Sequence, residues 1–477
     1  MEETMLKKWF LAVMILTIVA IGWGFRLEHR VNAQSPNYDL YLPLVIKDRG
    51  QTVFGVEVGY FNSSMADKAK NVGATWVRIN GLLWSDIQPT KQGGYVWQNA
   101  SVLEGSLTNA AQRRLQTILI VRSTPSWAQQ KPGSYCGPIK PENLGDFAQF
   151  MHETVKRYSV YPYNVLYYEL WNEPDVAPEL VPGDSVFGCW GNLNDTYYGG
   201  GYYAQMLQAV YGAVKSANPN AQVVLGGLLL DCDPRNVGTG YCPNTNATRA
   251  PRFFEGVLRN NGASYFDYIS FHGYPTYSVN FTPIQSEKNF PSWSASGGVV
   301  AGKINFLRSV MVQYGVDKPL LHTEGALLLG ANQTPDQVGA EAFQQAKADY
   351  VVWLYARNWS LGVKGTTWYT LNGPGWRYSG LLDSNQNPLP GYTALRFMTE
   401  ILNDYQYNQE ILHENDTFGF EFRKGTSKIW VVLTPDKNAR VISTPSGITA
   451  AYDPLGNAVS YGTSITITRP TYLLINP

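Results

Sequence analysis

Two apolar, strand-like segments of the chain each lead into a glutamate. The first is YYELWNEPD at 167–175, which contains Glu173, and the second is PLLHTEG at 319–325, which contains Glu324. Two carboxyl groups can together break a glycosidic bond. One keeps its proton and protonates the leaving group, while the other is ionised and attacks or stabilises the sugar carbon. We therefore predict that Glu173 and Glu324 are a catalytic pair.

The segments between residues 53 and 401 alternate between strand-like and helical patterns. The strand-like runs are 53–60, 75–80, 117–123, 165–174, 222–230, 266–275, 319–327 and 363–371, and helical patterns include 142–159, 202–217, 302–315 and 342–358. Continuous hydrophobicity in each strand indicates a parallel sheet buried on both faces, and eight such units predict a (β/α)8 TIM barrel. An open doubly wound sheet is the alternative. It favours a glycine-rich phosphate turn after the first strand, which EVGYFNSSM at 57–65 does not provide.

The pattern changes after Leu402. Short strand-like runs separated by turns occur at 418–423, 427–434, 448–453, 464–469 and 471–475. They predict a small antiparallel β-sandwich. The fold class is therefore α/β, and we divide the chain into a leader at 1–33, a linker at 34–52, the barrel at 53–401 and the sandwich at 402–477.

The leader has the features of an export signal. Lys7 and Lys8 precede an apolar run at 9–25, and Val-Asn-Ala at 31–33 offers a small-residue cleavage site. Because the run lies at the lower length limit for a membrane span, an anchor through residues 9–25 stays open beside a cleaved signal. Either alternative predicts an extracellular body.

The charge balance argues against a nucleic-acid partner. Lys plus Arg is 37 and Asp plus Glu is 37, with no basic run. Aromatic residues make up 13% of the chain, which suits both a large core and surfaces that stack on sugar rings. We expect a carbohydrate as the partner, and the sequence indicates no oligomeric state.

Four cysteines lie in loop-like sequence, at Cys136, Cys189, Cys232 and Cys242. An even number in an exported chain favours disulfides, and four cysteines allow three connectivities. We expect Cys232 to pair with Cys242 in one loop. Cys136 and Cys189 follow neighbouring strands, so we expect them to pair as well. No CxxC spacing occurs, and we predict neither a metal site nor a cofactor.

Active sites of (β/α)8 barrels lie at the carboxyl ends of the strands. Besides the two glutamates, polar and aromatic side chains fall at such ends, and we take them as substrate-binding candidates: Arg78, Asn172, His272, Tyr274 and Trp368. Their joint placement with two carboxylates at one mouth is typical of a sugar-cleaving site.

Three segments carry a family resemblance: YYELWNEPD, RINGLLWSDIQPTKQGGYVW at 78–97 and TPSWA at 124–128. They resemble the retaining glycoside hydrolases of clan A, whose catalytic glutamates lie on strands 4 and 7. Within the clan the likeness is greatest to family 39, the β-xylosidase and α-iduronidase family. YDPLGN at 452–457 and PTYLLIN at 470–476 are similar to the sandwich that accompanies such barrels.

The resemblance implies that Glu173 is the acid/base and Glu324 the nucleophile. It also implies that Arg78 and Tyr274 bond Glu324 and keep it ionised. A cation is expected to lower the pKa of Glu324, and a neighbouring carboxylate to raise that of Glu173. The two carboxyl groups should lie about 5–5.5 Å apart.

The resemblance assigns the remaining candidates to the sugar. Asn172 would bond the 2-hydroxyl, His272 would line the pocket, and Trp368 would form its floor, with a cis peptide between Trp368 and Tyr369. The resulting expectation is a secreted retaining O-glycoside hydrolase that acts on a polysaccharide or oligosaccharide. A non-catalytic carbohydrate-binding protein and a transglycosylase are the alternatives, and the loop at 176–201 matches no family pattern that would name the sugar.

Overall fold

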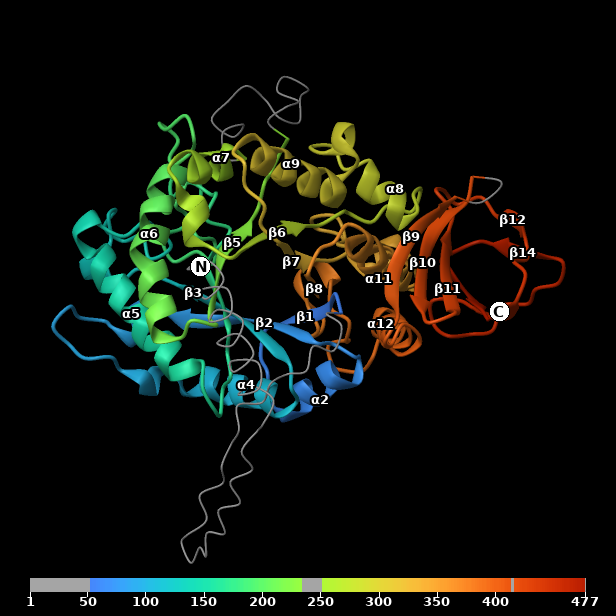
Figure 1. Ribbon diagram of the computed structural model, residues 1–477, viewed down its shortest axis with the longest axis horizontal. Helices are drawn as coiled ribbons and strands as arrows, with labels where there is room; N and C mark the ends of the chain where they lie inside the picture. The colour runs from blue at the N-terminus through green and yellow to red at the C-terminus, as the bar shows by residue number, and fades with distance from the viewer. Residues whose placement is uncertain (1–51, 234–250, 413–415, 477) are drawn as a thin grey trace, which may run out of the picture. The chain divides into compact units, whose positions relative to one another are not determined.

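The computed structural model describes residues 52–233, 251–412 and 416–476 (Figure 1). Eight parallel strands close into a barrel in chain order. They are β1 (Phe54–Val58), β2 (Trp76–Leu83), β3 (Gln116–Arg122), β4 (Tyr167–Asn172), β5 (Gln222–Leu228), β6 (Tyr268–Gly273), β7 (Leu320–Gly325) and β8 (Gly365–Trp368). Closure between β8 and β1 excludes the open sheet and confirms the predicted barrel.

Helices connect the strands and cover the barrel. The α-helices are α2 (Ser63–Asn71), α3 (Trp84–Ile87), α4 (Ser101–Gln112), α5 (Leu144–Tyr158), α6 (Gly200–Ala217), α7 (Arg252–Arg259), α8 (Pro283–Lys288), α9 (Val299–Gln313), α10 (Pro335–Val338), α11 (Ala340–Ser360) and α12 (Pro390–Ile401). In α5 the buried side chains recur every three or four residues, from Phe147 to Tyr158, as expected for a helix with one face on a barrel.

The C-terminal strands form two antiparallel sheets. One has the order β13-β15-β11-β10-β9, and the other pairs β12 with β14. The strands are β9 (Gln406–Leu412), β10 (Phe418–Lys424), β11 (Ser427–Leu433), β12 (Arg440–Ser443), β13 (Ile448–Tyr452), β14 (Ser464–Ile467) and β15 (Thr471–Ile475). An antiparallel C-terminal sheet domain is thus confirmed.

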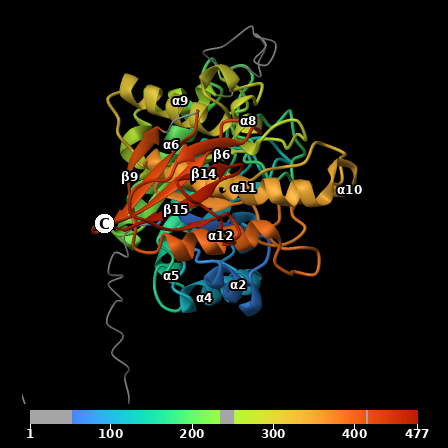
Figure 2. The ribbon, with the colours of Figure 1, turned by 90° about the vertical axis from the view of Figure 1, so that its right-hand side faces the viewer.

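Helix α11 is buried on nearly every side because it lies between the barrel and the C-terminal sheet (Figures 1 and 2). Its Trp359 packs edge-on against Phe54 of β1, with ring centroids 5.6 Å apart. Its Trp353 packs edge-on against Phe418 of β10 at 5.7 Å. The barrel and the C-terminal strands belong to one compact unit, so the proposed boundary at 401–402 stays a prediction.

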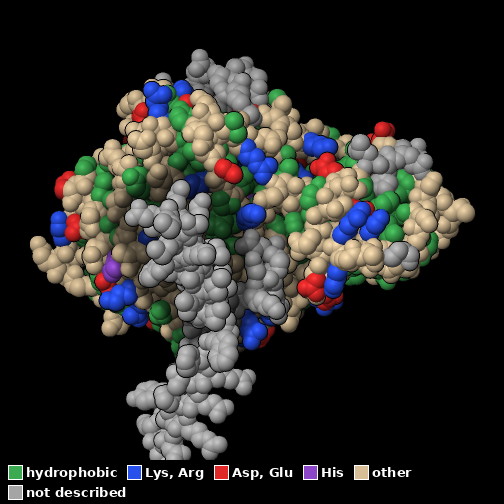
Figure 3. All heavy atoms as spheres, in the orientation of Figure 1, with side chains coloured by type: hydrophobic (Ala, Val, Ile, Leu, Met, Phe, Trp, Pro, Cys, Tyr) green, Lys and Arg blue, Asp and Glu red, His purple; other side chains and the backbone are tan. Residues whose placement is uncertain are grey.

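Several predictions fall on other parts of the chain. The leader at 1–33, most of the linker at 34–52 and Cys242 lie outside the described residues. Among the helices within 52–233, 251–412 and 416–476, none is long and apolar enough to cross a membrane. On the described surface in Figure 3, basic and acidic side chains are interspersed, in keeping with a formal net charge of zero.

Candidate active site

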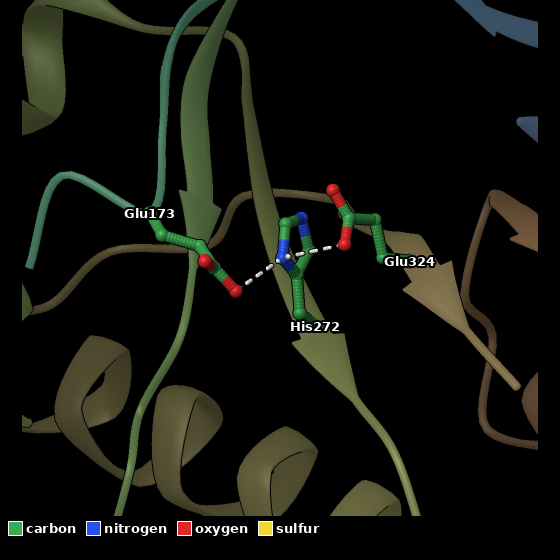
Figure 4. Close-up of side chains that lie close together, drawn as sticks. All are labelled: Glu173, His272 and Glu324. Carbon is green, nitrogen blue, oxygen red and sulfur yellow. Dashed lines mark hydrogen bonds and ion pairs between the residues drawn. The ribbon is translucent and has the colours of Figure 1, made fainter. Parts of the chain in front are cut away.

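All of the predicted side chains except Trp368 meet at the carboxyl-end side of the barrel. Arg78 lies on β2, Asn172 ends β4, and Glu173 follows it. His272 lies on β6 and Glu324 on β7. Each is buried. Figure 4 shows the ring of His272 between the two glutamates.

Arg78 is the centre of a buried hydrogen-bond network. Its Nη1 donates to Glu324 Oε1 at 2.5 Å and to Glu57 Oε2 at 2.6 Å. Its Nε donates to Glu169 Oε2 at 2.6 Å, and its Nη2 donates to Asn172 Oδ1 at 2.7 Å. One guanidinium therefore fixes the position of the candidate nucleophile and of the asparagine beside the candidate acid.

Glu57 and Glu169 are members of this network that the sequence analysis missed. Glu169 Oε1 accepts hydrogen bonds from the Gly227 amide and the Ser270 hydroxyl, both at 2.8 Å, so it also links β4 to β5 and β6. A signal existed in the sequence. Both glutamates stand inside apolar strands, where a carboxylate needs a partner, and Arg78 stands in a third such strand.

The two catalytic candidates are close together. One carboxylate oxygen of Glu173, one of Glu324 and a ring nitrogen of His272 lie within 4.8 Å of one another. His272 Nδ1 and Glu173 Oε1 share a hydrogen bond of 2.9 Å, and the same nitrogen is 3.4 Å from Glu324 Oε2. The two carboxyl groups thus face one another across a single imidazole.

The backbone at the end of β4 turns both Asn172 and Glu173 into the pocket. Adjacent residues of a regular strand point to opposite faces. Here Trp171 and Glu173 have φ angles of 65° and 50°, in the left-handed region that costs a non-glycine residue about 1–3 kcal/mol. The Trp171 Nε1 donates to the Cys136 carbonyl at 3.1 Å, and the Glu173 amide donates to the Gly227 carbonyl at 2.9 Å, which holds the turn in place.

A similar departure places Glu324 on β7. The pairing of β7 with β8 shifts between His322 and Gly325. Thr323 Oγ1 donates to Glu169 at 3.2 Å while the next residue, Glu324, accepts from Arg78. Two consecutive side chains therefore reach the barrel interior.

His272 is a neutral contact between the glutamates. Burial, and then the charge of Arg78, lower the pKa of His272 well below its ordinary value. Its Nε2 has no hydrogen-bond partner among the described residues. A Cβ on Gly227 would lie 2.1 Å from that nitrogen, so glycine leaves the space in which the ring sits.

The two glutamates differ in how firmly they hold a proton. Burial, and next the charge of Glu324, raise the pKa of Glu173 well above its ordinary value. Burial also raises the pKa of Glu324, but Arg78 and the Tyr274 hydroxyl oppose that rise. Arg78 thus lowers the pKa of Glu324 as predicted, but burial has the larger effect and leaves that pKa above its ordinary value. The electrostatics still favour Glu173 as the protonated partner.

Tyr274 joins the site directly after β6. Its hydroxyl donates a short hydrogen bond to Glu324 Oε2. Its ring also meets two aromatic rings of the segment after β8 edge-on, with centroids 6.0 Å from Tyr369 and 5.7 Å from Trp376. Trp376 is 52% exposed, so this aromatic group (Tyr274, Tyr369 and Trp376) extends from the nucleophile to the solvent.

Trp368 does not fit its predicted place on the pocket floor. It is fully buried, its Nε1 donates to the Ser379 carbonyl at 2.8 Å, and its ring packs against Tyr350 of α11 at 6.0 Å. The side chain therefore faces the helices, and the next residue, Tyr369, takes the pocket side because strand residues alternate between faces. The cis peptide is displaced in the same way: it joins Tyr369 to Thr370 rather than Trp368 to Tyr369.

The disulfide between Cys136 and Cys189 is confirmed. It joins the segment after β3 to the segment after β4, next to the Trp171 turn. The predicted partner of Cys232 is Cys242, which lies outside the described residues, so that pairing stays a prediction.

By distance alone, Glu173, His272 and Glu324 could hold a cation. Their atoms are already engaged, since His272 Nδ1 bonds Glu173 and both oxygens of Glu324 accept from Arg78 and Tyr274. We therefore interpret the cluster as an acid and a nucleophile rather than as a set of metal ligands.

Comparison with known proteins agrees with this geometry. The family model for cellulase (glycosyl hydrolase family 5) matches residues 46–362. No curated protein matches the sequence. A family 39 glycoside hydrolase from Bacteroides cellulosilyticus has a similar structure, with a TM-score of 0.66 and 17% identity over 90% of this chain and 82% of that one.

Two further solved structures are similar. A family 39 β-xylosidase from Caulobacter crescentus has a TM-score of 0.51 and 14% identity over 90% of this chain and 97% of that one. A family 30 xylanase from Clostridium acetobutylicum has a TM-score of 0.56 and 12% identity over 89% and 96%. The chain is a glycosidase that belongs to the cellulase family, glycosyl hydrolase family 5, and so to the clan A glycoside hydrolases, with a structural likeness to family 39.

Proposed function

We propose that the protein hydrolyses an O-glycosidic linkage with retention of configuration, using Glu324 as the nucleophile and Glu173 as the acid/base. The observation that carries the proposal is the approach of one oxygen of each carboxyl group to within 4.8 Å. Inverting enzymes need about 6.5–9.5 Å between their carboxyl groups to seat a water molecule, whereas retaining enzymes have about 5–5.5 Å. The spacing favours direct attack on the sugar.

The hydrogen bonds support a role for each group. Glu173, whose pKa is raised by burial and by the charge of Glu324, protonates the departing oxygen. Glu324, held by Arg78 and Tyr274, attacks the anomeric carbon to form a covalent intermediate. Glu173 then accepts a proton from the water that releases the sugar. Asn172, anchored by Arg78, is placed to bond the sugar next to the reacting carbon.

We assign the stacking surface for the sugar to Tyr369 and Trp376 in place of Trp368. Both rings contact Tyr274, which itself bonds the nucleophile. Sugar rings present apolar faces that pack well on aromatic side chains, and Trp376 offers an exposed ring. Trp376→Ala should raise KM more than it lowers kcat.

The substrate we propose is a polysaccharide or its oligosaccharide fragments, encountered outside the cytoplasm. The neighbours reported above include a β-xylosidase and a xylanase, and the matching family model is that of cellulase, which makes xylan- and glucan-type linkages the first to test. The basic and apolar leader at 1–33 and the Cys136–Cys189 disulfide support export.

The test is a panel of aryl glycosides and soluble polysaccharides, followed by NMR of the first-formed anomer. With an activated aryl glycoside, Glu173→Ala should keep much of its glycosylation rate, because that leaving group departs without a proton. On a natural linkage it should lose roughly 10²–10⁴-fold, the usual worth of a general acid. Glu324→Ala should fail on both.

Azide distinguishes the two roles further. With a β-glycoside, azide should yield a β-azide from the Glu173 variant and an α-azide from the Glu324 variant. Exchanged outcomes would reverse the assignment. An inverted first product from the wild type would refute the retaining mechanism.

A further inference from the structure

A buried lysine lies behind the acid/base. Lys303 is on α9 and is 5% exposed. Its Nζ donates to two backbone carbonyls, those of Leu229 at 2.5 Å and His272 at 2.8 Å. In the described part of the chain, this nitrogen forms no ion pair with a carboxylate. A buried cation that neutralises no direct partner is expensive to maintain, so its position calls for a reason.

The two carbonyls belong to the segments that hold Glu173. Leu229 follows β5, whose Gly227 carbonyl accepts the hydrogen bond of the Glu173 amide. His272 lies on β6, and its ring shares a hydrogen bond with Glu173 Oε1. Lys303 therefore ties together the two strand ends that fix the backbone and the carboxyl group of the acid/base.

Asp175 also holds the segment after β5. Its two carboxylate oxygens accept hydrogen bonds from the Leu229 amide at 2.9 Å and from the Leu230 amide at 2.8 Å. The segment after β5 is thus bonded at its carbonyl by Lys303 and at its amides by Asp175, two residues after Glu173. The positive and negative charges face the same short stretch of backbone.

We propose that Lys303 is a positioning residue of the acid/base: it ties β5 to β6 behind Glu173 and places a buried positive charge there. The inference rests on the proposed role of Glu173 as the acid. Lys303 acts through Glu173 and its supports and does not contact the sugar.

The charges around Glu173 determine the sign of the effect. Negative groups that face it are Glu324 and Asp175, and positive groups are Lys303 and Arg78. The neutral groups at the same pocket are His272, Tyr274 and Tyr369. Burial lowers the pKa of Lys303 to about 8, so the lysine is largely charged at neutral pH, and Asp231 also faces it. Removing its charge should leave Glu173 holding its proton to higher pH.

The chain offers a matched control. Lys347 on α11 is also fully buried, and its Nζ donates to the carbonyls of Tyr378 at 2.9 Å and Gly380 at 2.7 Å. It supports the segment after β8, and it is not among the charged groups that act on Glu173. A lysine that only stabilises loops should behave alike at both positions.

The experiment measures kcat/KM against pH on a substrate with a poor leaving group for the wild type and for Lys303→Met, Lys303→Gln, Lys303→Arg and Lys347→Met. The alkaline limb of that profile reports the loss of the proton from the catalytic acid. Lys303→Met and Lys303→Gln should move this limb up by roughly one pH unit, the effect of a unit charge at short range in a protein interior. Lys303→Arg and Lys347→Met should leave it in place.

Thermal unfolding of each variant separates a loss of stability from a change in the pKa of Glu173. Lys303→Met and Lys347→Met should both unfold at lower temperature, while only the first moves the limb. Lys303→Gln keeps a donor for the carbonyls and serves if the methionine variant does not fold. An unmoved limb in folded Lys303→Gln, or an equal shift in Lys347→Met, would overturn the inference.

Glu173→Ala on the same substrates tests the proposed function by itself. If it lacks the sensitivity to leaving group, the acid assignment fails whatever Lys303 does. If it shows that sensitivity and Lys303→Gln has no shifted limb, only the inference about Lys303 fails.

Discussion

Replacing Arg78 by methionine should damage the site and make the damage depend on pH. Arg78 is fully buried and donates to Glu57, Glu169, Glu324 and Asn172. Methionine fills much of the volume but leaves buried carboxyl groups without a cation. Breaking a buried ion pair by removing one partner costs about 3–5 kcal/mol, so we expect a loss of that order in the free energy of unfolding near pH 7.

The sign of the pH dependence follows from the carboxyl groups. Arg78 lowers the pKa of Glu57, Glu173 and Glu324 relative to what burial alone would give. Without it, their folded pKa values rise further above the unfolded values. An acid with a raised folded pKa binds its proton more tightly when folded, so stability falls as pH rises from the unfolded towards the folded pKa. Arg78→Met should therefore be least destabilised near pH 4 and most destabilised at neutral pH.

The pH dependence of activity should also change in Arg78→Met. Because Glu324 must be ionised to attack, the acid limb of the kcat/KM profile should move up by about 1–3 pH units, the usual effect of a neighbouring arginine on a carboxyl group. The assays are urea unfolding and kcat/KM between pH 4 and pH 9. Arg122→Met is the control: Arg122 ends β3, donates to Asn80 at 3.0 Å and should leave the limb unmoved. An unshifted acid limb in a folded Arg78→Met variant would refute the role given to Arg78.

Three further predictions follow from single contacts. Gly227→Ala should lower kcat/KM about 10²-fold. The added Cβ would displace the His272 ring, and the ring would then no longer hold the Glu173 carboxyl group in its position. Glu57→Gln should keep kcat/KM within about tenfold, since burial and the charge of Glu324 raise the pKa of Glu57 and make the neutral amide a close substitute. Replacing Cys136 and Cys189 by serine should cost about 2–4 kcal/mol of unfolding free energy, because the bridge closes a loop with a sequence separation of 53.

Each has its own check. Gly212→Ala on α6 should leave kcat/KM unchanged, because apart from its chain neighbours and its own helix backbone nothing lies within 4 Å of the added Cβ. Equal losses in both glycine variants would count against the His272 argument. A downward shift of the acid limb in Glu57→Gln would show that Glu57 carries a charge. A melting temperature that a reductant lowers equally in the wild type and in the double serine variant would show that the bridge contributes nothing.

The barrel could be predicted from the sequence because all eight of its strands are apolar runs separated by helical patterns. Strands β9 and β12 could not. In β12 only Ile442 is buried, and β9 is polar and forms the edge of its sheet, paired on one side with β10. Neither has the hydrophobic pattern that identifies a strand buried on both faces.

At the site, residue types were predictable and their exact register was not. Glu173 and Glu324 lie within the motifs YYELWNEPD and PLLHTEG, and the structure brings them together. The pocket floor was predicted at Trp368, whereas the neighbouring Tyr369 faces the pocket. A shift of one residue exchanges the two faces of a strand, and two adjacent aromatic residues do not reveal which ring faces inward. Lys303 lies in a helix far along the chain, so only the folded structure connects it to Glu173.

The most direct test of the central claim is to trap the covalent intermediate. A 2-deoxy-2-fluoro glycoside with an activated leaving group, of the sugar that the panel selects, should inactivate the enzyme by forming a stable ester. Mass spectrometry of the digested protein should find the sugar on the peptide that contains Glu324, and the ester should be lost in Glu324→Ala. A label on Glu173 or on any other residue would contradict the account.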